Sequence, residues 1–207
     1  MGQPATRTGL SPEEYLAFER ASEQKHEYAN GEIFAMSGCS RAHSLLAANL
    51  QRELGNVMLD RPCEVHTSDM RVKITSTGRY VYPDASVVCG EPAFEDAEVD
   101  TLINPNVIFE VLSDTSEGYD RGDKFALYRS VLSVTDYVLV SQKEVRIEHF
   151  QRQPDGRWLL SILGPGAQLA LESSGVVIDV DRVYLKVPLA PPEGGGAATA
   201  LQARAVR

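Results

Sequence analysis

Residues 107–112 read Val-Ile-Phe-Glu-Val-Leu, an almost wholly apolar run that is interrupted by one carboxylate, Glu110. A strand buried on both faces of its sheet is nearly continuous in hydrophobic residues, so this run predicts a central strand. Burying the Glu110 carboxylate is costly unless a cation, a metal ion or hydrogen bonds compensate its charge. Glu110 is therefore the first candidate site residue. The alternatives are a partly exposed glutamate at a strand end or a glutamate paired with a core arginine.

The chain before this strand predicts a helix, a hairpin and a longer helix. Ser11-Pro12-Glu13-Glu14 combines a capping hydroxyl, a first-turn proline and a carboxylate three residues after the cap, so a short helix begins there. Asn30-Gly31 lies between two short extended pieces of residues 27–34, and this dipeptide is the strongest local signal of a tight hairpin. Ser40 is the expected N-cap of the longest helix, residues 40–59, where apolar side chains recur at helical spacing.

From residue 63 onward the pattern becomes extended. Residues 63–74 alternate and residues 80–89 are rich in β-branched and aromatic side chains, which predicts two strands joined by a Ser-Thr-Gly turn. Beyond the central strand, residues 118–130 predict a helix, and three further runs predict strands at 136–141, 145–150 and 158–163. The fold class is therefore α/β or α+β, with a mixed central β-sheet flanked by helices and with an N-terminal helix and β-hairpin.

The length and composition indicate one domain. A chain of 207 residues matches a single core. We assign residues 11–187 to that domain, residues 1–10 to a flexible N-terminus and residues 188–207 to a disordered tail rich in Pro, Gly and Ala. The sequence contains no apolar run of roughly 18 residues and no signal-peptide stretch, so we expect a soluble cytoplasmic protein with no membrane partner.

Charge and cysteine content restrict the class of partner. The chain has 20 Lys and Arg against 29 Asp and Glu, a net charge of −9, which argues against a broad basic surface for nucleic acid. A phosphate-binding protein of this composition needs a local basic cleft, a metal ion, or both. Cys39, Cys63 and Cys89 are odd in number and widely spaced, so we expect lone buried thiols and neither a disulfide nor a zinc site.

Two further motifs could complete a site with Glu110. Asp84 follows Pro83 at the head of an apolar strand, and carboxylates on neighbouring strands can approach closely enough to bind a hard cation such as Mg²⁺. Taken alone, Asp84 is more typical of a turn cap. Asp120, Lys124 and Tyr128 share one helix face at spacing four, where the lysine could hold a phosphate oxygen or orient a water. The alternative is a surface Asp-Lys pair on a solvated helix.

In this order, Pro-Asp, a hydrophobic strand with Glu and a helix with Lys resemble the PD-(D/E)XK nuclease superfamily. From Tyr15 to Val140 the chain resembles more closely the Uma-two family of restriction-endonuclease-like proteins. The matching segments are Lys25-His26-Glu27-Tyr28, Asn30-Gly31-Glu32-Ile33, His43, Ser68-Asp69-Met70-Arg71-Val72, Tyr82-Pro83-Asp84-Ala85-Ser86-Val87-Val88, Phe109-Glu110-Val111-Leu112-Ser113, and Asp120 with Asp123-Lys124 and Tyr128.

The resemblance implies a restriction-endonuclease-like fold in which Asp84 and Glu110 ligate a divalent metal ion and a lysine assists. The superfamily's general pattern places that lysine two residues after the glutamate, but Leu112 occupies this position here. Lys124 of the following helix is the natural substitute, and the assignment depends on its amine facing the two carboxylates.

Two residues of the resemblance have open roles. Glu27 is either a third acidic ligand or hydrogen-bonding group of the site, or a residue at the edge of the hairpin. His43 either belongs to the site or only hydrogen-bonds the helix cap.

The leading functional hypothesis is an endonuclease that hydrolyses DNA with Mg²⁺, or Mn²⁺ in its place, and no organic cofactor. A homodimer would suit the cutting of two strands. The first alternative is a nuclease-fold binding or assembly module that cuts nothing, and the position of Lys124 discriminates between the two. The second alternative is a metal-dependent hydrolase of small phosphate esters, which a closed and narrow pocket would favour.

Overall fold

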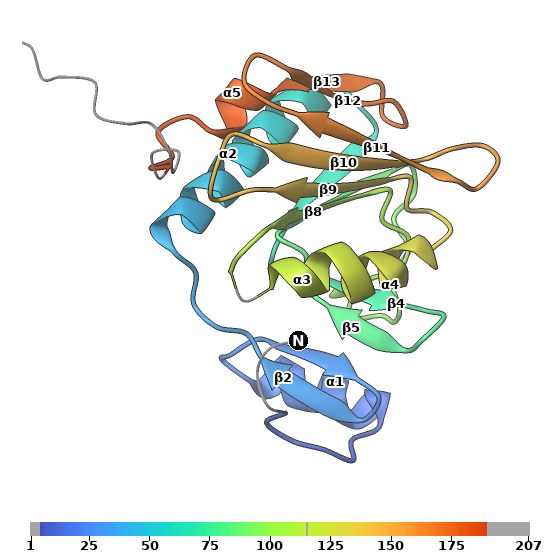
Figure 1. The fold of residues 1–207 in the computed structure, drawn as a ribbon. Coiled ribbons are helices and arrows are strands. Elements are labelled where there is room, and N and C mark those ends of the chain that lie inside the picture. Colours follow the sequence, from blue (N-terminus) through green and yellow to red (C-terminus); the bar gives the residue numbers. More distant parts are fainter. Residues whose placement is uncertain (1–4, 115, 190–207) are drawn as a thin grey trace, which may run out of the picture.

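The strand predicted at residues 107–112 lies inside the largest sheet of the computed structural model, which describes residues 5–114 and 116–189 (Figure 1). This strand is β8, and all five of its residues are buried. It pairs with an antiparallel neighbour on one side and with a parallel neighbour on the other, so the sheet is mixed as predicted. The strand order is β11-β10-β9-β8-β6-β3, with bounds β3 Cys63–Thr67, β6 Ala85–Cys89, β8 Val107–Val111, β9 Asp136–Val140, β10 Ile147–Arg152 and β11 Trp158–Leu163.

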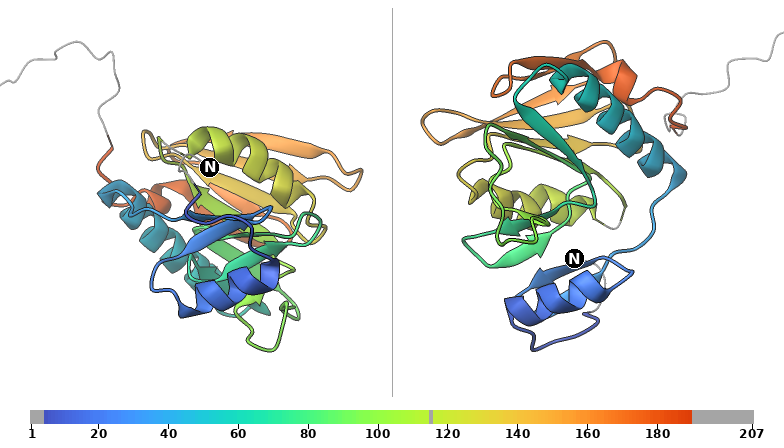
Figure 2. Two further views of the ribbon diagram at one scale, coloured as in Figure 1. Left: turned by 90° about the horizontal axis from the view of Figure 1, so that it is seen from below. Right: turned by 180° about the vertical axis from the view of Figure 1, so that it is seen from behind.

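Both faces of this sheet are covered, which explains the apolar run. The helix α2 (Arg41–Met58) covers one face and the shorter helical segment of residues 117–129 covers the other (Figures 1 and 2). Alternate β8 residues belong to different cores: Phe109 packs with α2, and Ile108 packs with Tyr128 of the shorter segment. The core on the α2 side is completed by elements that the sequence did not predict, namely β12 Gln168–Leu171, β13 Val176–Asp179 and α5 Val180–Val183. Glu110 has the same parity as Ile108, so it points away from α2.

The structure contains a second, smaller sheet, which includes half of each of the two long strands that we predicted. Each of them is broken, and its two halves enter different sheets: β3 and β6 pair in the large sheet, whereas β4 and β5 pair in the small one. The second break falls at Pro83, which has no N–H to continue a ladder. The order of the small sheet is β2-β1-β5-β4-β7, with bounds β1 His26–Ala29, β2 Glu32–Ala35, β4 Arg71–Ile74, β5 Arg79–Val81 and β7 Thr101–Leu102.

The N-terminal helix and hairpin form as predicted. The helix α1 (Pro12–Ala21) begins with a complete capping box, in which the side chains of Ser11 and Glu14 each accept a hydrogen bond from the other's backbone N–H. Asn30 and Gly31 have φ angles of 52° and 87°, the left-handed pair that a tight hairpin turn requires. Figure 1 shows this N-terminal unit beside the main body, and the small core between its helix and hairpin also includes Tyr80 of β5.

The described part of the expected flexible N-terminus is attached to this unit. The N–H of Thr6 donates a hydrogen bond to Ile33, and Arg7 accepts one from the same residue. The predicted C-terminal tail lies almost wholly in residues 190–207, outside the described residues. Within the described part, no helix has both the length and the apolar character needed to cross a bilayer.

The helix predicted at residues 118–130 is present but not regular. It consists of α3 (Glu117–Tyr119), a π-helical turn η1 (Asp120–Lys124) and α4 (Phe125–Arg129). π-helical turns occur mostly as single turns and frequently at functional sites. A spacing of four between polar residues does not distinguish this geometry from a uniform α-helix.

The cysteine prediction is wrong. Cys63 and Cys89 form a disulfide and Cys39 is exposed, whereas we expected three lone buried thiols. The two bonded residues are 26 positions apart in the chain, yet they are direct cross-strand partners in the β3–β6 pair. Sequence spacing does not show this pairing, because it arises only when the two strands adopt their antiparallel register.

Reducing this disulfide should lower the free energy of unfolding by about 3 kcal/mol, because the cross-link removes the entropy of a loop of this length from the unfolded chain. Urea denaturation with and without dithiothreitol measures the difference, and Cys39→Ser is the control that removes the exposed thiol. Equal denaturation midpoints in the two conditions would contradict the disulfide.

Candidate active site

The break between the two sheets, the middle of β8 and the π-helical turn meet at one pocket of about 970 Å³. Its lining includes six of the seven predicted site residues, and the seventh, Tyr128, lies buried behind Glu110. Five of these six residues come from the main body and one comes from the N-terminal hairpin. The six are Glu27, His43, Asp84, Glu110, Asp120 and Lys124.

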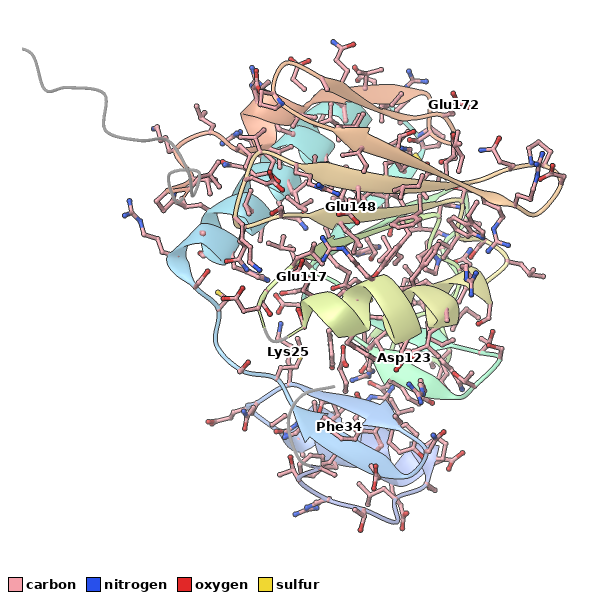
Figure 3. The ribbon with its side chains drawn as sticks, in the orientation of Figure 1. Lys25, Phe34, Glu117, Asp123, Glu148 and Glu172 are labelled. Carbon is pink, nitrogen blue, oxygen red and sulfur yellow. A yellow bond between two sulfur atoms is a disulfide. The ribbon has the colours of Figure 1, made fainter. Side chains whose placement is uncertain are left out.

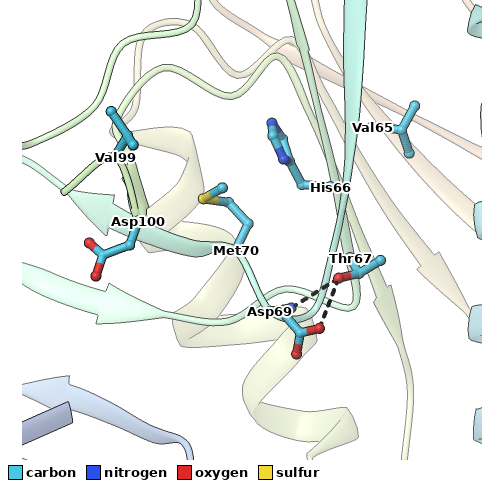
Figure 4. Close-up of a pocket in the computed structure, with 7 residues that line it drawn as sticks. All are labelled: Val65, His66, Thr67, Asp69, Met70, Val99 and Asp100. Carbon is cyan, nitrogen blue, oxygen red and sulfur yellow. Dashed lines mark hydrogen bonds between the residues drawn. The ribbon is translucent and has the colours of Figure 1, made fainter. Parts of the chain in front are cut away.

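A second, smaller pocket of about 410 Å³ lies around His66 and Met70 (Figure 4). Its two carboxylates already have cationic partners: Asp69 pairs with Lys25, and Asp100 pairs with arginine side chains. This pocket therefore offers no uncompensated charge, and the larger pocket is the candidate site.

Lys124 faces inward and is surrounded by carboxylates. Its Nζ lies 2.7 Å from Oε1 of Glu110, 3.6 Å from Oε1 of Glu27 and 3.8 Å from Oδ1 of Asp120. The residue is only 5% exposed, so the alternative of a solvated surface pair is wrong. Burial disfavours the ammonium form, but the three carboxylates outweigh burial and raise the pKa of Lys124 well above its usual value. Lys124 is therefore a fixed positive charge inside the pocket.

Glu110 is the most deeply placed carboxylate of the pocket, at 4% exposure. Burial raises its pKa well above the usual value, and the charges of Asp120 and Asp84 add to this effect, whereas Lys124 opposes it. The hydroxyl of Tyr128 donates a hydrogen bond of 3.2 Å to Oε1 of Glu110. The carboxylate that interrupts the apolar run is thus compensated by a lysine and a tyrosine, and not by the core arginine that we had considered.

Asp84 connects the sheet boundary to the central strand. Its Oδ2 accepts a hydrogen bond of 2.7 Å from the backbone N–H of Val111, the residue that follows Glu110. Its Oδ1 lies 3.2 Å from Nε2 of His43, and the side chain remains 17% exposed toward the pocket. Asp84 therefore joins two elements, as a turn cap would, and also presents a carboxylate beside Glu110.

His43 takes part in the helix cap and also lines the pocket. Its backbone N–H donates to the Ser40 hydroxyl at the start of α2, while its ring contacts Asp84. Burial lowers the pKa of the His43 imidazole, but the hydrogen bond and charge of Asp84 outweigh burial and raise it. The neighbouring carboxylate therefore stabilises the charged form of the ring.

The sequence pattern missed two tyrosines that support the π-helical turn. Tyr119 lines the pocket, and burial raises the pKa of its phenol to about 12. The Tyr137 hydroxyl donates a hydrogen bond of 2.9 Å to the backbone carbonyl of Asp120 and so anchors the turn on β9. Tyr137 belongs to an apolar strand pattern, so no sequence signal distinguishes it from a core residue.

The predicted site residues that line the pocket carry an excess of negative charge. Four carboxylates, those of Glu27, Asp84, Glu110 and Asp120, face the ammonium of Lys124 and one histidine. Carboxylate oxygens are the ligands of hard divalent cations, so the donor chemistry fits Mg²⁺ or Mn²⁺ at Asp84 and Glu110. In the part of the chain that the structure describes, no three His, Cys, Asp or Glu side chains are arranged to hold an ion between them. Mg²⁺ commonly takes one or two carboxylates and fills its remaining positions with water and phosphate oxygens.

A family model described as "Putative restriction endonuclease", Uma2, matches residues 12–181 of this chain. The chain belongs to the Uma2 family. All seven predicted site residues lie inside the matched range, and the resemblance stated from the sequence is confirmed.

Among the relatives of this chain are two proteins of Synechocystis sp., each described as an "Uncharacterized protein". slr1290 is 38% identical over 175 residues, 84% of this chain and 91% of that protein. sll1609 is 38% identical over 166 residues, 80% of this chain and 94% of that protein.

A solved structure from Anabaena variabilis, described as "a putative nuclease belonging to DUF820", is similar to this Uma2 chain. The TM-score is 0.68 at 16% sequence identity, and the match covers 84% of this chain and 97% of that one. At this identity the likeness concerns the fold, and it confirms the restriction-endonuclease-like fold class that the sequence predicts.

Replacing Lys124 with methionine should lower the free energy of unfolding by about 3–5 kcal/mol, because it leaves buried carboxylates without their cation. Glu110→Gln should cost less, below about 1 kcal/mol. Because the pKa of Glu110 is raised in the fold, its protonated form stabilises the protein at low pH, and this stabilisation is lost as the pH rises through the folded-state pKa. The ionised form therefore destabilises the fold at neutral pH. Urea denaturation at pH 7 without divalent cations measures both variants. Equal losses in the two would contradict the charge imbalance.

Proposed function

We propose that this Uma2 protein is a divalent-metal-dependent endonuclease that hydrolyses the phosphodiester bonds of DNA. The observation that carries the proposal is the position of Lys124, whose amine lies 2.7 Å from Glu110 in a pocket that also contains Asp84. Membership of a restriction-endonuclease family and a nuclease-like fold support a hydrolase. The enzyme hypothesis needs a lysine that faces the carboxylates, whereas a pure assembly module does not need one.

Asp84 and Glu110 would hold Mg²⁺, or Mn²⁺ in its place, because they are the two carboxylates joined through the backbone of β8. When bound, the cation supplies Lewis-acid polarisation of the phosphoryl group and eases deprotonation of the attacking water. Tyr128 and His43 act as positioning residues, since each fixes the orientation of one of these carboxylates through a direct contact.

Lys124 remains protonated, so it acts as a hydrogen-bond donor and not as a base. Its ammonium can donate to a non-bridging oxygen of the scissile phosphate, where negative charge increases during the reaction. The oxygen of water bonds to phosphorus and gives up one proton to solvent, the bond from phosphorus to the leaving oxygen breaks, and the leaving oxygen takes up a proton from solvent. Electrostatic stabilisation by a preorganised cation favours this step because Lys124 does not have to move out of water.

A hydrolase of small phosphate esters is the second candidate. The pocket volume of about 970 Å³ lies within the range of small-ligand sites, which favours it. Bis-p-nitrophenyl phosphate is a suitable probe, and turnover of this ester without any cleavage of DNA would select the second candidate. The homodimer expected from the sequence stays a prediction that gel filtration can test.

Asp84→Asn and Glu110→Gln should each abolish calorimetric binding of Mn²⁺ and reduce plasmid cleavage in Mg²⁺ by about 100-fold or more, because one charged ligand is lost. Glu172→Gln is the matched control, since Glu172 is an exposed carboxylate that Figure 3 places on the opposite side of the molecule from the hairpin. A wild-type protein that binds no divalent cation and cuts no DNA would refute the enzyme and leave the assembly module.

The affinity for Mn²⁺ should increase as the pH rises from about 5.5 to 8. The raised pKa of Glu110 keeps a proton on this carboxyl at low pH, and a cation must displace that proton before it binds. Calorimetry in two buffers of different ionisation enthalpy measures the number of protons released. An affinity that does not change with pH, together with no proton release, would contradict Glu110 as a ligand.

A further inference from the structure

Phe34 is exceptional among the six phenylalanines of the chain, all of which the structure describes. The other five belong to one of the three hydrophobic clusters, but Phe34 belongs to none. Its ring is half-buried and lines the pocket, and it makes no ring contact with another described aromatic residue. Packing of the fold therefore does not account for a large apolar side chain at this position.

The register of the hairpin directs this ring toward the candidate site. Phe34 is the direct cross-strand partner of Glu27, and the next pair along, Tyr28 and Ile33, points to the opposite face and into the N-terminal core. Direct cross-strand partners have Cβ atoms about 4.5–5.5 Å apart. The carboxylate of Glu27 lies 3.6 Å from the amine of Lys124, so the Phe34 ring lies beside a residue that contacts this amine. Figure 3 shows Phe34 on this hairpin, opposite the helical segment that carries the lysine.

An aromatic face beside a phosphate-binding cation is the combination with which proteins bind single-stranded nucleic acid. Bases stack on aromatic rings without regard to sequence, and cations follow the backbone phosphates. Lys25 and Lys143 also line the pocket, one before the hairpin and one in the β9–β10 loop, and each could contact a neighbouring phosphate. Both now pair with acidic side chains, Lys25 with Asp69 and Lys143 with Glu117.

A continuous duplex does not match this geometry. In a duplex, each base face is covered by the next base pair, so a base can stack on a protein ring only when it is unpaired or extruded. The reactive groups are also recessed, since Glu110 and Lys124 are 4% and 5% exposed. A scissile phosphate must therefore enter the pocket to reach them, and an unpaired strand can bend to do so.

We propose that the pocket takes an unpaired stretch of a DNA strand, one base of which stacks on Phe34 while the adjoining phosphate lies at Lys124. This inference rests on the proposed function and specifies its substrate class: single-stranded segments such as flaps, bubbles and frayed ends. Phe34 is then a residue that determines specificity, and it takes no part in the chemistry.

The test compares three Phe34 variants on three forms of one labelled oligonucleotide: the single strand, the perfect duplex and a duplex with a central unpaired bubble. Phe34→Ala and Phe34→Leu should raise the Kd for the single strand by about 5- to 100-fold, measured by fluorescence anisotropy in Ca²⁺, because a base loses its aromatic partner. Phe34→Trp should keep the wild-type Kd. Cleavage in Mg²⁺ should be faster for the single strand and the bubble than for the duplex.

Leu132→Ala is the control, because Leu132 is an exposed apolar side chain that does not line the pocket. Thermal unfolding should be nearly unchanged in every Phe34 variant, since the ring belongs to no core. Equal cleavage of duplex and single strand, with no effect of Phe34→Ala on either, would overturn the inference and leave the endonuclease intact. Phe34-dependent binding of the single strand by a wild-type protein that cuts no DNA would refute the endonuclease and keep the binding site.

Discussion

The buried contact between the ammonium of Lys124 and the carboxylate of Glu110, at 2.7 Å, is the constraint on which the rest of the site depends. Neither charge is tolerated alone in a core that is apolar on both faces of β8. The central strand, the π-helical turn and the N-terminal hairpin must therefore come together before either side chain can be buried. The same contact leaves an excess of negative charge around Lys124, because Glu27 and Asp120 also lie close to its amine.

The transfer of the chain between two sheets determines where the acidic groups lie. Pro83 lies between the two ladders, and Asp84 immediately precedes β6 with its side chain bound to the backbone N–H of Val111. A single interruption thus supplies a carboxylate at the sheet boundary and fixes it against the central strand. The small sheet then brings the hairpin, with Glu27 and Phe34 on one face, to the opposite wall of the pocket.

Local patterns predicted much of this arrangement, because capping, hairpin turns and buried strands have strong sequence signals. They also placed Glu110 and Lys124 on adjacent elements. They could not show that Cys63 and Cys89 are cross-strand neighbours, since that follows from register, nor that two alternating runs divide between sheets. The position of Phe34 was equally hidden, because an apolar residue in a hairpin has the same pattern whether it faces a core or a pocket.

The π-helical turn at residues 120–124 makes the site sensitive to the length of the chain around it. Tyr128 lies after this turn and contacts Glu110, whereas Asp120 begins the turn and lies close to Lys124. Removing or adding one residue would rotate everything beyond it by about 100°, the angle between successive residues of a helix. The pocket therefore depends on the length of this segment as well as on the identity of its residues.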